Sequence, residues 1–238
     1  MLHNILVKFI FCTLSFCTLS ASAIQISSMF YVADSLGQGV FTVNNITDKR
    51  LFLNVGMNEV KVEGGKLVKV YYTRENVNDW ELSVRPGKTL IEPGFEKDFR
   101  VSITCLPECR ANDDMLFQLA FVPTPYVEKE LVSQQKVQMA IGFAPLFVLP
   151  AEIPVLDYEV KYKKNKLYLK NKGNTYLQLT IDGCVKEAGN KDCQQQIKLL
   201  AGREMEVTLN DNVSKSPIKI IAKTYKSKLK DERFLDRE

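Results

Sequence analysis

The sequence has 238 residues, of which 45% are hydrophobic and 25% charged, and its formal net charge is +4. That length is enough for one large or two small domains, and the charge is too small to indicate nucleic acid or an acidic membrane as a partner. Its only histidine is His3. If the leader described next is removed, the mature chain has no imidazole for a catalytic triad or a metal site, so we expect no enzyme and no cofactor.

The first 23 residues have the pattern of a secretory signal peptide. Lys8 is the only charge before an apolar run from Phe9 to Leu19, and Ala21-Ser22-Ala23 provides the small residues that precede a cleavage site. We therefore predict cleavage after Ala23 and export of residues 24–238. The apolar run is too short to span a membrane, and no later segment is long and apolar enough, so no membrane insertion is expected.

Short strands dominate the rest of the chain, and no segment keeps a helical period. Turn sequences such as Glu63-Gly64-Gly65, Glu92-Pro93-Gly94 and Asn171-Lys172-Gly173-Asn174 separate the apolar runs. This spacing is typical of all-β sandwiches. The predicted strands cover 26–33, 39–43, 51–56, 67–72, 80–84, 97–104, 115–122, 136–149, 157–163, 166–170, 175–182, 195–200, 204–209 and 217–224.

Pro150 and Pro154 bracket a short, stiff connection between two groups of strands. We therefore predict one sandwich domain over 24–150 and a second over 151–225. The mixed charges of residues 226–238 predict a solvated tail. Trp80, the single tryptophan, is expected in the core of the first sandwich.

Four cysteines follow the leader, in the close pairs Cys105 with Cys109 and Cys184 with Cys193. An even number in local pairs favours disulfide bonds in an exported protein, and both pairs lack the tight two-residue spacing common in zinc sites. A bridge between Cys184 and Cys193 would close the end of a hairpin. The loop between Cys105 and Cys109 is very short, and whether that pair is bridged stays open.

Two polar stretches have simple structural interpretations. Residues 161–168 interleave lysines with tyrosines, a pattern that occurs in platforms for single-stranded nucleic acid, but a hairpin with one basic solvent face explains it better. Asp113 and Asp114 lack the spaced oxygen ligands and the glycine of a calcium loop, so they predict a polar loop.

Residues 136–150 carry the most informative pattern. Large apolar side chains alternate with small or polar ones, which is the period of a β-strand. In an ordinary half-buried strand, the bulky row would fill the core. The bulky row is Val137, Met139, Ile141 and Phe143, and the small residues between and after them include Ala140, Gly142 and Ala144.

The chain resembles the periplasmic pilus-assembly chaperones of the chaperone-usher family. In the first domain the resemblance lies in order and spacing: Phe41 to Asn45, Trp80 to Pro86, Leu90 to Gly94 followed by Lys97 and Arg100, Met115 to Leu119, and the segment ending at Pro150. In the second domain, residues 167–174, Cys184, Cys193 and Leu200-Ala201-Gly202 look similar to the alternate, common-pilus branch. The opening residues 26–30 resemble that branch too.

This resemblance implies two immunoglobulin-like domains in an L-shaped arrangement and a role in the periplasm. Such a chaperone completes the sandwich of a pilus subunit by donating its last first-domain strand, and it delivers the subunit to an outer-membrane usher. The subunit-binding residues would then be Val137, Met139, Ile141 and Phe143, while Ala140, Gly142 and Ala144 would pack against the chaperone's own sheet. Self-association of the free protein, which would hide this row, is left open.

The basic pair with which known members grip the subunit's terminal carboxylate has no counterpart here. Lys136, Arg100 and Lys97 are the nearest substitutes, although ordinary solvated charges explain them as well. Two other functions stay open: a structural component of the surface or pilus, and an exported hydrolase, which the missing histidine disfavours.

Overall fold

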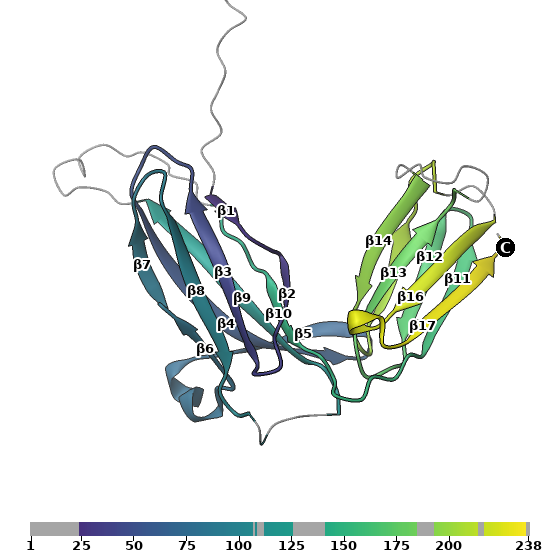
Figure 1. The fold of residues 1–238 in the computed structure, drawn as a ribbon, viewed down its shortest axis with the longest axis horizontal. Helices are drawn as coiled ribbons and strands as arrows, with labels where there is room; N and C mark the ends of the chain where they lie inside the picture. The colour runs from purple at the N-terminus through teal and green to yellow at the C-terminus, as the bar shows by residue number, and fades with distance from the viewer. Residues whose placement is uncertain are drawn as a thin grey trace, which may run out of the picture.

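The computed structural model describes residues 24–106, 108, 112–125, 141–184, 193–213 and 217–236. Within these residues the chain forms two β-sandwiches, which Figure 1 shows set at an angle and joined at one end. The predicted all-β, L-shaped architecture is therefore confirmed. The predicted signal peptide and its cleavage site lie outside the described residues.

The first sandwich packs a four-stranded sheet against a six-stranded one. The chain enters along the first sheet and crosses to the second within its first ten described residues, so that β1 and β2 belong to different sheets. The first sheet has the order β1 (Ile24–Ile26), β3 (Gln38–Asn45), β8 (Glu96–Ile103) and β6 (Leu82–Arg85). The second has the order β2 (Phe30–Val32), β10 (Leu146–Leu149), β9 (Met115–Pro125), β4 (Leu51–Glu63) and β5 (Lys66–Tyr71), with β7 (Lys88–Ile91) paired to β4 and a 3-10 turn, η2 (Arg74–Asp79), after β5.

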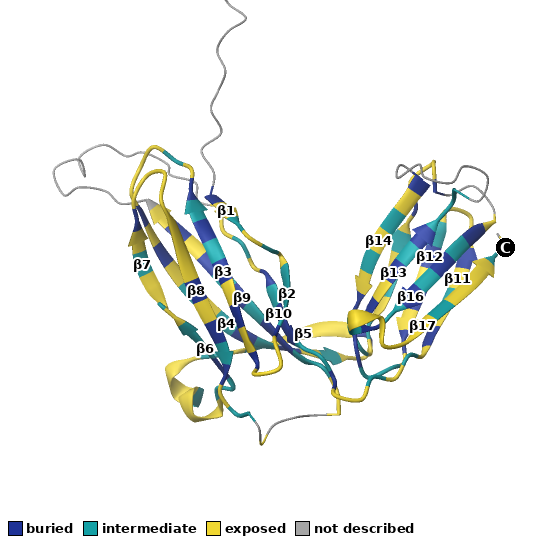
Figure 2. Cartoon of the chain, in the orientation of Figure 1, coloured by how far each residue is buried: buried dark blue, intermediate teal, exposed yellow. Residues whose placement is uncertain are grey.

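Phenylalanine rings fill the space between these two sheets. Five of them are completely buried, and the centroids of Phe99 and Phe121 lie 5.2 Å apart in an edge-to-face contact. Figure 2 shows buried and exposed residues alternating along β3 and β8, as the period of a strand requires. The five buried rings are Phe41, Phe99, Phe117, Phe121 and Phe147.

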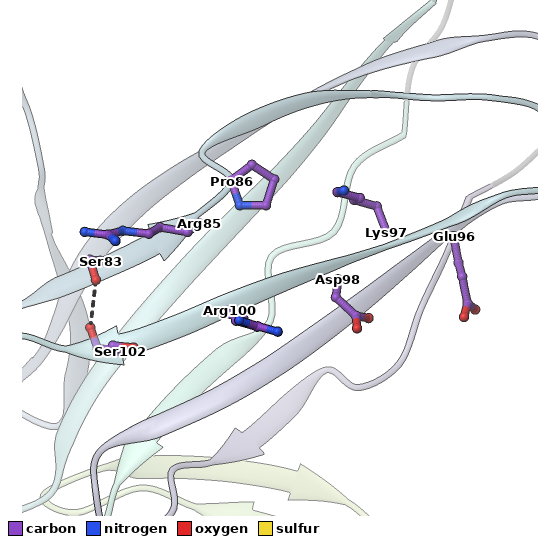
Figure 3. A pocket seen from close by; sticks show the side chains of 8 residues that line it. All are labelled: Ser83, Arg85, Pro86, Glu96, Lys97, Asp98, Arg100 and Ser102. Atoms are coloured by element: carbon purple, nitrogen blue, oxygen red, sulfur yellow. Dashed lines mark hydrogen bonds between the residues drawn. The ribbon is translucent and has the colours of Figure 1, made fainter.

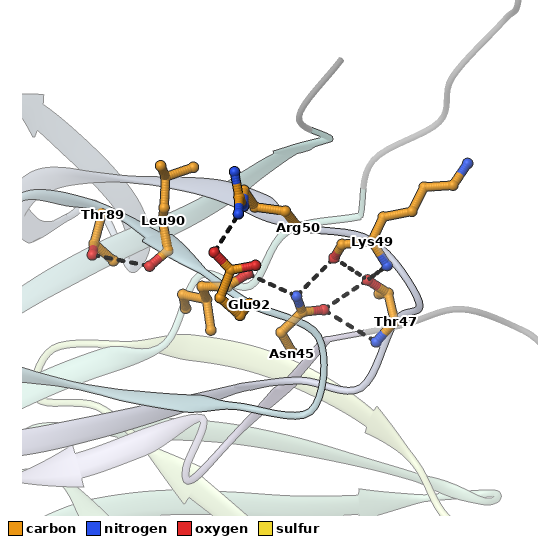
Figure 4. Close-up of polar contacts among 8 residues, drawn as sticks. Asn45, Thr47, Lys49, Arg50, Thr89, Leu90 and Glu92 are labelled. Carbon is orange, nitrogen blue, oxygen red and sulfur yellow. Dashed lines mark hydrogen bonds and ion pairs between the residues drawn. The ribbon is translucent and has the colours of Figure 1, made fainter. Parts of the chain in front are cut away.

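Asn45 fixes the turn between β3 and β4 at the far end of this sandwich. Its side-chain amide donates a hydrogen bond to the carbonyl oxygen of Lys49 at 2.8 Å, as Figure 4 shows, and another to the carbonyl oxygen of Ile91 at 2.9 Å. Beside it, Arg50 pairs with Glu92 at 2.8 Å. These contacts tie the β3–β4 turn to the end of β7, so the turn belongs to the rigid frame of the sandwich.

The second sandwich has a three-stranded and a four-stranded sheet. Their buried faces consist mainly of leucine, isoleucine and tyrosine side chains. The three-stranded sheet has the order β11 (Tyr158–Lys163), β12 (Lys166–Asn171) and β15 (Glu204–Thr208). The four-stranded sheet has the order β14 (Gln194–Leu199), β13 (Leu177–Asp182), β16 (Ile218–Lys223) and β17 (Lys230–Leu235), with a 3-10 turn, η5 (Tyr225–Ser227), between the last two.

The prediction of a solvated tail over 226–238 is wrong. Residues 230–235 form β17, which pairs with the whole of β16. The inward-facing residue Asp231 accepts a hydrogen bond from the Tyr158 hydroxyl at 2.8 Å, and the Arg233 guanidinium lies 4.3 Å from the centre of the Tyr158 ring. Burial, followed by the bond to Asp231, raises the pKa of Tyr158. Polar contacts therefore hold a strand that has almost no apolar alternation.

The structure also moves Trp80 out of the predicted core. Its ring is half-buried and stacks on Tyr72, with centroids 5.4 Å apart, and its Nε1 donates to the Asn76 side chain. The basic hairpin of residues 161–168 has the expected solvent face. Cross-strand carboxylates pair with it, since Lys166 contacts Glu206 at 2.5 Å.

A third apolar cluster joins the two sandwiches. Val60, Leu116 and Val148 from the first sandwich pack with Tyr176 and Leu200 from the second, and all five are buried. Around them lie the partly buried side chains of Phe30, Val32, Val62, Leu146 and Tyr225. Because this cluster involves both domains, it fixes how the second sandwich sits beside β2 and β10.

Asp114 ties the same junction together with hydrogen bonds. Its two carboxylate oxygens accept from the backbone N–H of Ala151 (2.9 Å) and of Tyr176 (2.6 Å). Its own N–H donates to the carbonyl oxygen of Asn174 at 3.0 Å. Burial raises the pKa of this carboxyl group despite these bonds. Asp114 thus links the start of β9 to the connection between the sandwiches and to the second sandwich itself.

The tip of the β4–β5 hairpin makes a second link. The carbonyl oxygen of Gly65 accepts hydrogen bonds from the Arg203 guanidinium (2.9 Å) and the Glu204 N–H (3.1 Å). Gly65 has a φ of +76°, and a Cβ there would lie 2.8 Å from Cγ of Glu204. Only glycine meets both the turn geometry and this close approach.

Candidate functional site

The described part of the predicted donor segment, residues 136–149, begins at Ile141 and runs along β9. Phe143 forms an isolated bridge with Phe121, with hydrogen bonds of 2.7 and 3.0 Å in the two directions. Further on, Leu146 lies opposite Gln118 and Phe147 opposite Phe117. The same register therefore holds from Phe143 to the end of β10. Lys136, Val137 and Met139 lie outside the described residues, so their roles stay predictions.

This register corrects the prediction for Phe143. Opposite residues of an antiparallel pair face the same side, and Phe121 and Phe117 both point into the first core. Phe143 accordingly packs against that core, as Phe147 does. The prediction that Phe143 faces a partner protein is therefore wrong, because Phe143 and Phe147 both face the first core.

Of the small residues that were predicted to pack against the chain's own sheet, Ala144 is placed differently, Gly142 lies against β9, and Ala140 lies outside the described residues. Ala144 is exposed and does not pack against the chain's own sheet. Gly142 is exposed as well, but it lies so close to β9 that a Cβ would come 2.5 Å from the carbonyl oxygen of Phe121. Glycine at this position allows the segment to approach β9 closely just before it pairs.

Ile141 has the solvent-facing position expected of a subunit-binding residue. Its side chain is 73% exposed, more than that of Val122, which is 50% exposed on the neighbouring strand β9. Met29, in the connection between β1 and β2, is 53% exposed. Its carbonyl oxygen accepts the N–H of Leu146 at 3.0 Å, so Met29 lies next to the start of β10. Whether a partner covers Ile141 stays a prediction.

One edge of the backbone is open upstream of β10. From Leu146 onward, β2 pairs with β10 in parallel and covers it. Before that point, Phe143 and Pro145 bond only to β9, and the side chain of Gln118 donates to the Ala144 carbonyl at 3.2 Å. Among the described residues, none accepts the N–H of Ala144 and none bonds to the backbone of Gly142. An extended partner segment has room to pair along this edge.

Arg100 and Lys97 lie on β8, in the four-stranded sheet, whereas β10 belongs to the other sheet. Arg100 sits directly opposite Arg85 of β6, and Figure 3 shows both beside an open hollow of about 940 Å³. The structure therefore does not bring these two basic residues to the described part of the donor segment, residues 141–149. Lys136, the third candidate for a carboxylate grip, lies outside the described residues.

Cys184 and Cys193 form a disulfide bond, with Cα atoms 5.4 Å apart, at the end of the β13–β14 hairpin. The sequence had predicted this bridge. Cys105 is partly buried against the first core, and Cys109 lies outside the described residues, so that pairing stays a prediction. In the part of the chain that the structure describes, no group of three or more histidine, cysteine, aspartate or glutamate side chains is placed to hold a metal ion.

Sequence reasoning missed the role of Asp114. Its signal was only an acidic pair in a loop, and the partners that distinguish Asp114 from Asp113 come from residues far along the chain. It also missed Lys198, whose ammonium group lies 4.7 Å from the centre of the Phe30 ring across the junction.

The sequence is similar to fimbrial proteins. Residues 26–150 match the family described as the CS5 fimbrial protein N-terminal domain. A protein of Escherichia coli, described as an uncharacterized 25.9 kDa protein in the CS5 3' region, is 21% identical over 72% of this chain and 76% of its own length.

Solved structures of pilus chaperones share the fold. The complex of the SafA pilin with the SafB chaperone of Salmonella enterica contains a chain with a TM-score of 0.56 and 10% identity, covering 90% of this chain and 97% of its own. A chain of the CsuC–CsuE chaperone and tip subunit complex of Acinetobacter baumannii has a TM-score of 0.54 and 13% identity, covering 91% and 100%. For the class 5 fimbriae chaperone CfaA the values are 0.52, 12%, 89% and 98%.

The matched family region begins at the last residue of β1 and ends just after β10, so it includes all the other strands of the first sandwich. It also covers more than half of the chain. The assignment to the common-pilus branch stays a prediction, because none of these matches distinguishes it. The protein belongs to the family defined by the CS5 fimbrial protein N-terminal domain, and its two sandwiches have the fold of the chaperone-usher pilus chaperones.

Proposed function

We propose that this protein is a periplasmic chaperone that binds pilus subunits through the donor segment, residues 136–149, and delivers them to an outer-membrane usher. The observation that carries the proposal is the open backbone edge at Gly142 and Ala144, next to the exposed side chain of Ile141. A partner strand that pairs there gains backbone hydrogen bonds and an apolar contact together. The reaction is binding and release, so the proposal includes no catalytic residue and no cofactor.

Family and fold support the same role. Two of the structures with this fold are complexes of a chaperone with a pilin or a tip subunit. Delivery to an usher and residence in the periplasm rest on this likeness and on the predicted signal peptide. No helix within the described residues is long and apolar enough to cross a membrane.

The test is an Ile141→Asp variant with Ile153→Asp as its matched control. Ile141 is 73% exposed and Ile153 is 77% exposed, so both changes should leave the fold intact. Full burial of an isoleucine side chain against a partner contributes about 1.5 to 3 kcal/mol, and a buried unpaired aspartate adds a further cost. Co-purification of a fimbrial subunit with the chain should therefore fall at least tenfold for the first variant.

The control variant should retain the subunit at the level of the original chain. Circular dichroism and the amount of soluble exported protein show whether both variants fold. Equal capture by the two folded variants would mean that the donor segment does not bind through Ile141. Absence of any co-purifying subunit with the original chain would contradict the chaperone role itself.

A second candidate function is a structural component of the fimbria. The description of the matched family as a fimbrial protein favours it. Cell fractionation separates the two functions. The chaperone should appear in the periplasmic extract and be absent from fibres sheared from the surface, whereas a structural component should be enriched in those fibres.

A further inference from the structure

Three residues on neighbouring strands of the second sandwich form a row of hydrogen-bond donors. Gln178 of β13 lies opposite Lys198 of β14 on one side and opposite Lys223 of β16 on the other. Neighbouring strands are about 4.8 Å apart, which places the two lysine backbones about 10 Å apart with the glutamine amide between them. We refer to Lys198, Gln178 and Lys223 as the basic row.

The basic row points away from the core of the second sandwich. The residues that alternate with it, such as Leu177, Leu199 and Ala222, are completely buried. Lys198 and Gln178 are exposed and Lys223 is half-buried. All three side chains therefore face the same outer surface of the four-stranded sheet.

Several other lysines on the strands of this sandwich have carboxylate partners. Lys166 pairs with Glu206, and Lys170 with Glu204 at 2.6 Å, on the three-stranded sheet. Lys219 pairs with Glu232 at 2.5 Å, two same-face rows along β16 from the basic row. Within the described residues, no carboxylate pairs with Lys198 or Lys223. Two positive charges in one row do not stabilise the sheet by themselves. Both ammonium groups can therefore pair with acidic groups of another protein.

The basic row begins at the junction between the sandwiches. The Lys198 ammonium lies 4.7 Å from the centre of the Phe30 ring, and Phe30 belongs to β2, which pairs with β10. Figure 1 shows β14 on the side of the second sandwich that faces the first. A protein bound at the open edge upstream of β10 would therefore lie near this row.

We propose that the basic row binds carboxylate groups in an acidic segment of the captured pilus subunit. The inference rests on the proposed function, because it names a second contact for the same partner. Each ammonium group can donate charge-assisted hydrogen bonds to a carboxylate, and the Gln178 amide provides an uncharged donor between them. The row thus favours subunits whose acidic side chains are spaced along a strand.

The first experiment needs no subunit. An acetylated, amidated tetraglutamate peptide is titrated into the isotope-labelled mature protein at low salt, and backbone amide shifts are followed by NMR. Shifts should concentrate at the basic row and disappear at high ionic strength. The double variant Lys198→Gln/Lys223→Gln should bind about tenfold more weakly, while Lys161→Gln, an exposed lysine on the other sheet, should bind like the original chain.

The second experiment measures capture of the subunit by the double variant Lys198→Glu/Lys223→Glu, with Lys161→Glu as control. If the basic row binds the subunit, the double variant should capture less subunit than the original chain does. Capture by the original chain and by the control should both decrease strongly as the salt concentration rises. If the peptide binds the double glutamine variant as well as it binds the original chain, or shifts residues elsewhere, the row is not a carboxylate site. If the peptide result holds but the original chain captures no subunit, the proposed function fails and the row's carboxylate binding stands.

Discussion

Replacing Asp114 by alanine should weaken the junction between the sandwiches. The change removes the acceptors of two backbone N–H groups, those of Ala151 and Tyr176, and both residues are buried. A buried donor without an acceptor costs about 1 to 3 kcal/mol. The raised pKa of Asp114 indicates that burying its carboxylate has a cost, and the alanine variant does not have this cost. The net loss of stability is therefore smaller than the cost of two unpaired donors. We expect a loss of about 2 to 3 kcal/mol in the free energy of unfolding.

Urea denaturation of the mature protein measures this loss. Fluorescence of Trp80 reports on the first sandwich, and far-ultraviolet circular dichroism reports on both. Asp113→Ala is the matched control, because Asp113 is the exposed neighbour, and it should change the free energy by less than about 0.5 kcal/mol. Small-angle scattering should show a broader distribution of domain arrangements only for Asp114→Ala. Equal midpoints and equal scattering for the two variants would refute the role of Asp114 as a link between the domains.

Three further outcomes are expected. Phe143→Ala should cost about 2 kcal/mol in urea unfolding because its ring packs on the core, whereas Ile141→Ala should be nearly neutral; the reverse order would contradict the register. Replacing Cys184 and Cys193 by serine should cost the second sandwich about 2.5 kcal/mol, measured without reductant. The pKa of Asp114 is higher in the folded than in the unfolded protein, so its contribution to stability is lost as the pH rises from the unfolded to the folded pKa. Over this pH range the free energy of unfolding should fall more for the original chain than for Asp114→Asn.

Alternation of apolar residues was sufficient to predict the sandwiches but not the facing of each strand. The bulky row of residues 137–143 shows this limit, because a period of two defines two faces without saying which one the core takes. The pairing of Phe143 with Phe121 turns Phe143 inward, whereas Ile141 of the same row is exposed, and that pairing depends on the whole sheet. The disulfide was predictable because its two cysteines lie close in sequence on either side of a hairpin loop.

Polar elements were the hardest to predict. The strand β17 reads as a charged tail because its inward positions include Asp231 and Arg233, which satisfy each other and Tyr158 instead of filling a core. Asp114 and Lys198 depend on partners from the other sandwich, and no local pattern reveals such partners. Polar side chains that stabilise the fold through distant partners can be recognised only once the tertiary structure is known.

The burial of β10 narrows where a partner protein can bind. Phe147 faces the first core, while Leu146 and Val148 on its other face belong to the cluster between the sandwiches. Both faces of β10 are therefore occupied by the chain itself, and β2 covers its free edge. Since Phe143 also packs inward, the contact surface that we propose for the donor segment lies upstream of Leu146, where Ile141 is exposed and the backbone edge at Gly142 and Ala144 is open. The basic row then lies beyond the downstream end of that surface, across the junction, so the two sites would hold a subunit at separate points along its length.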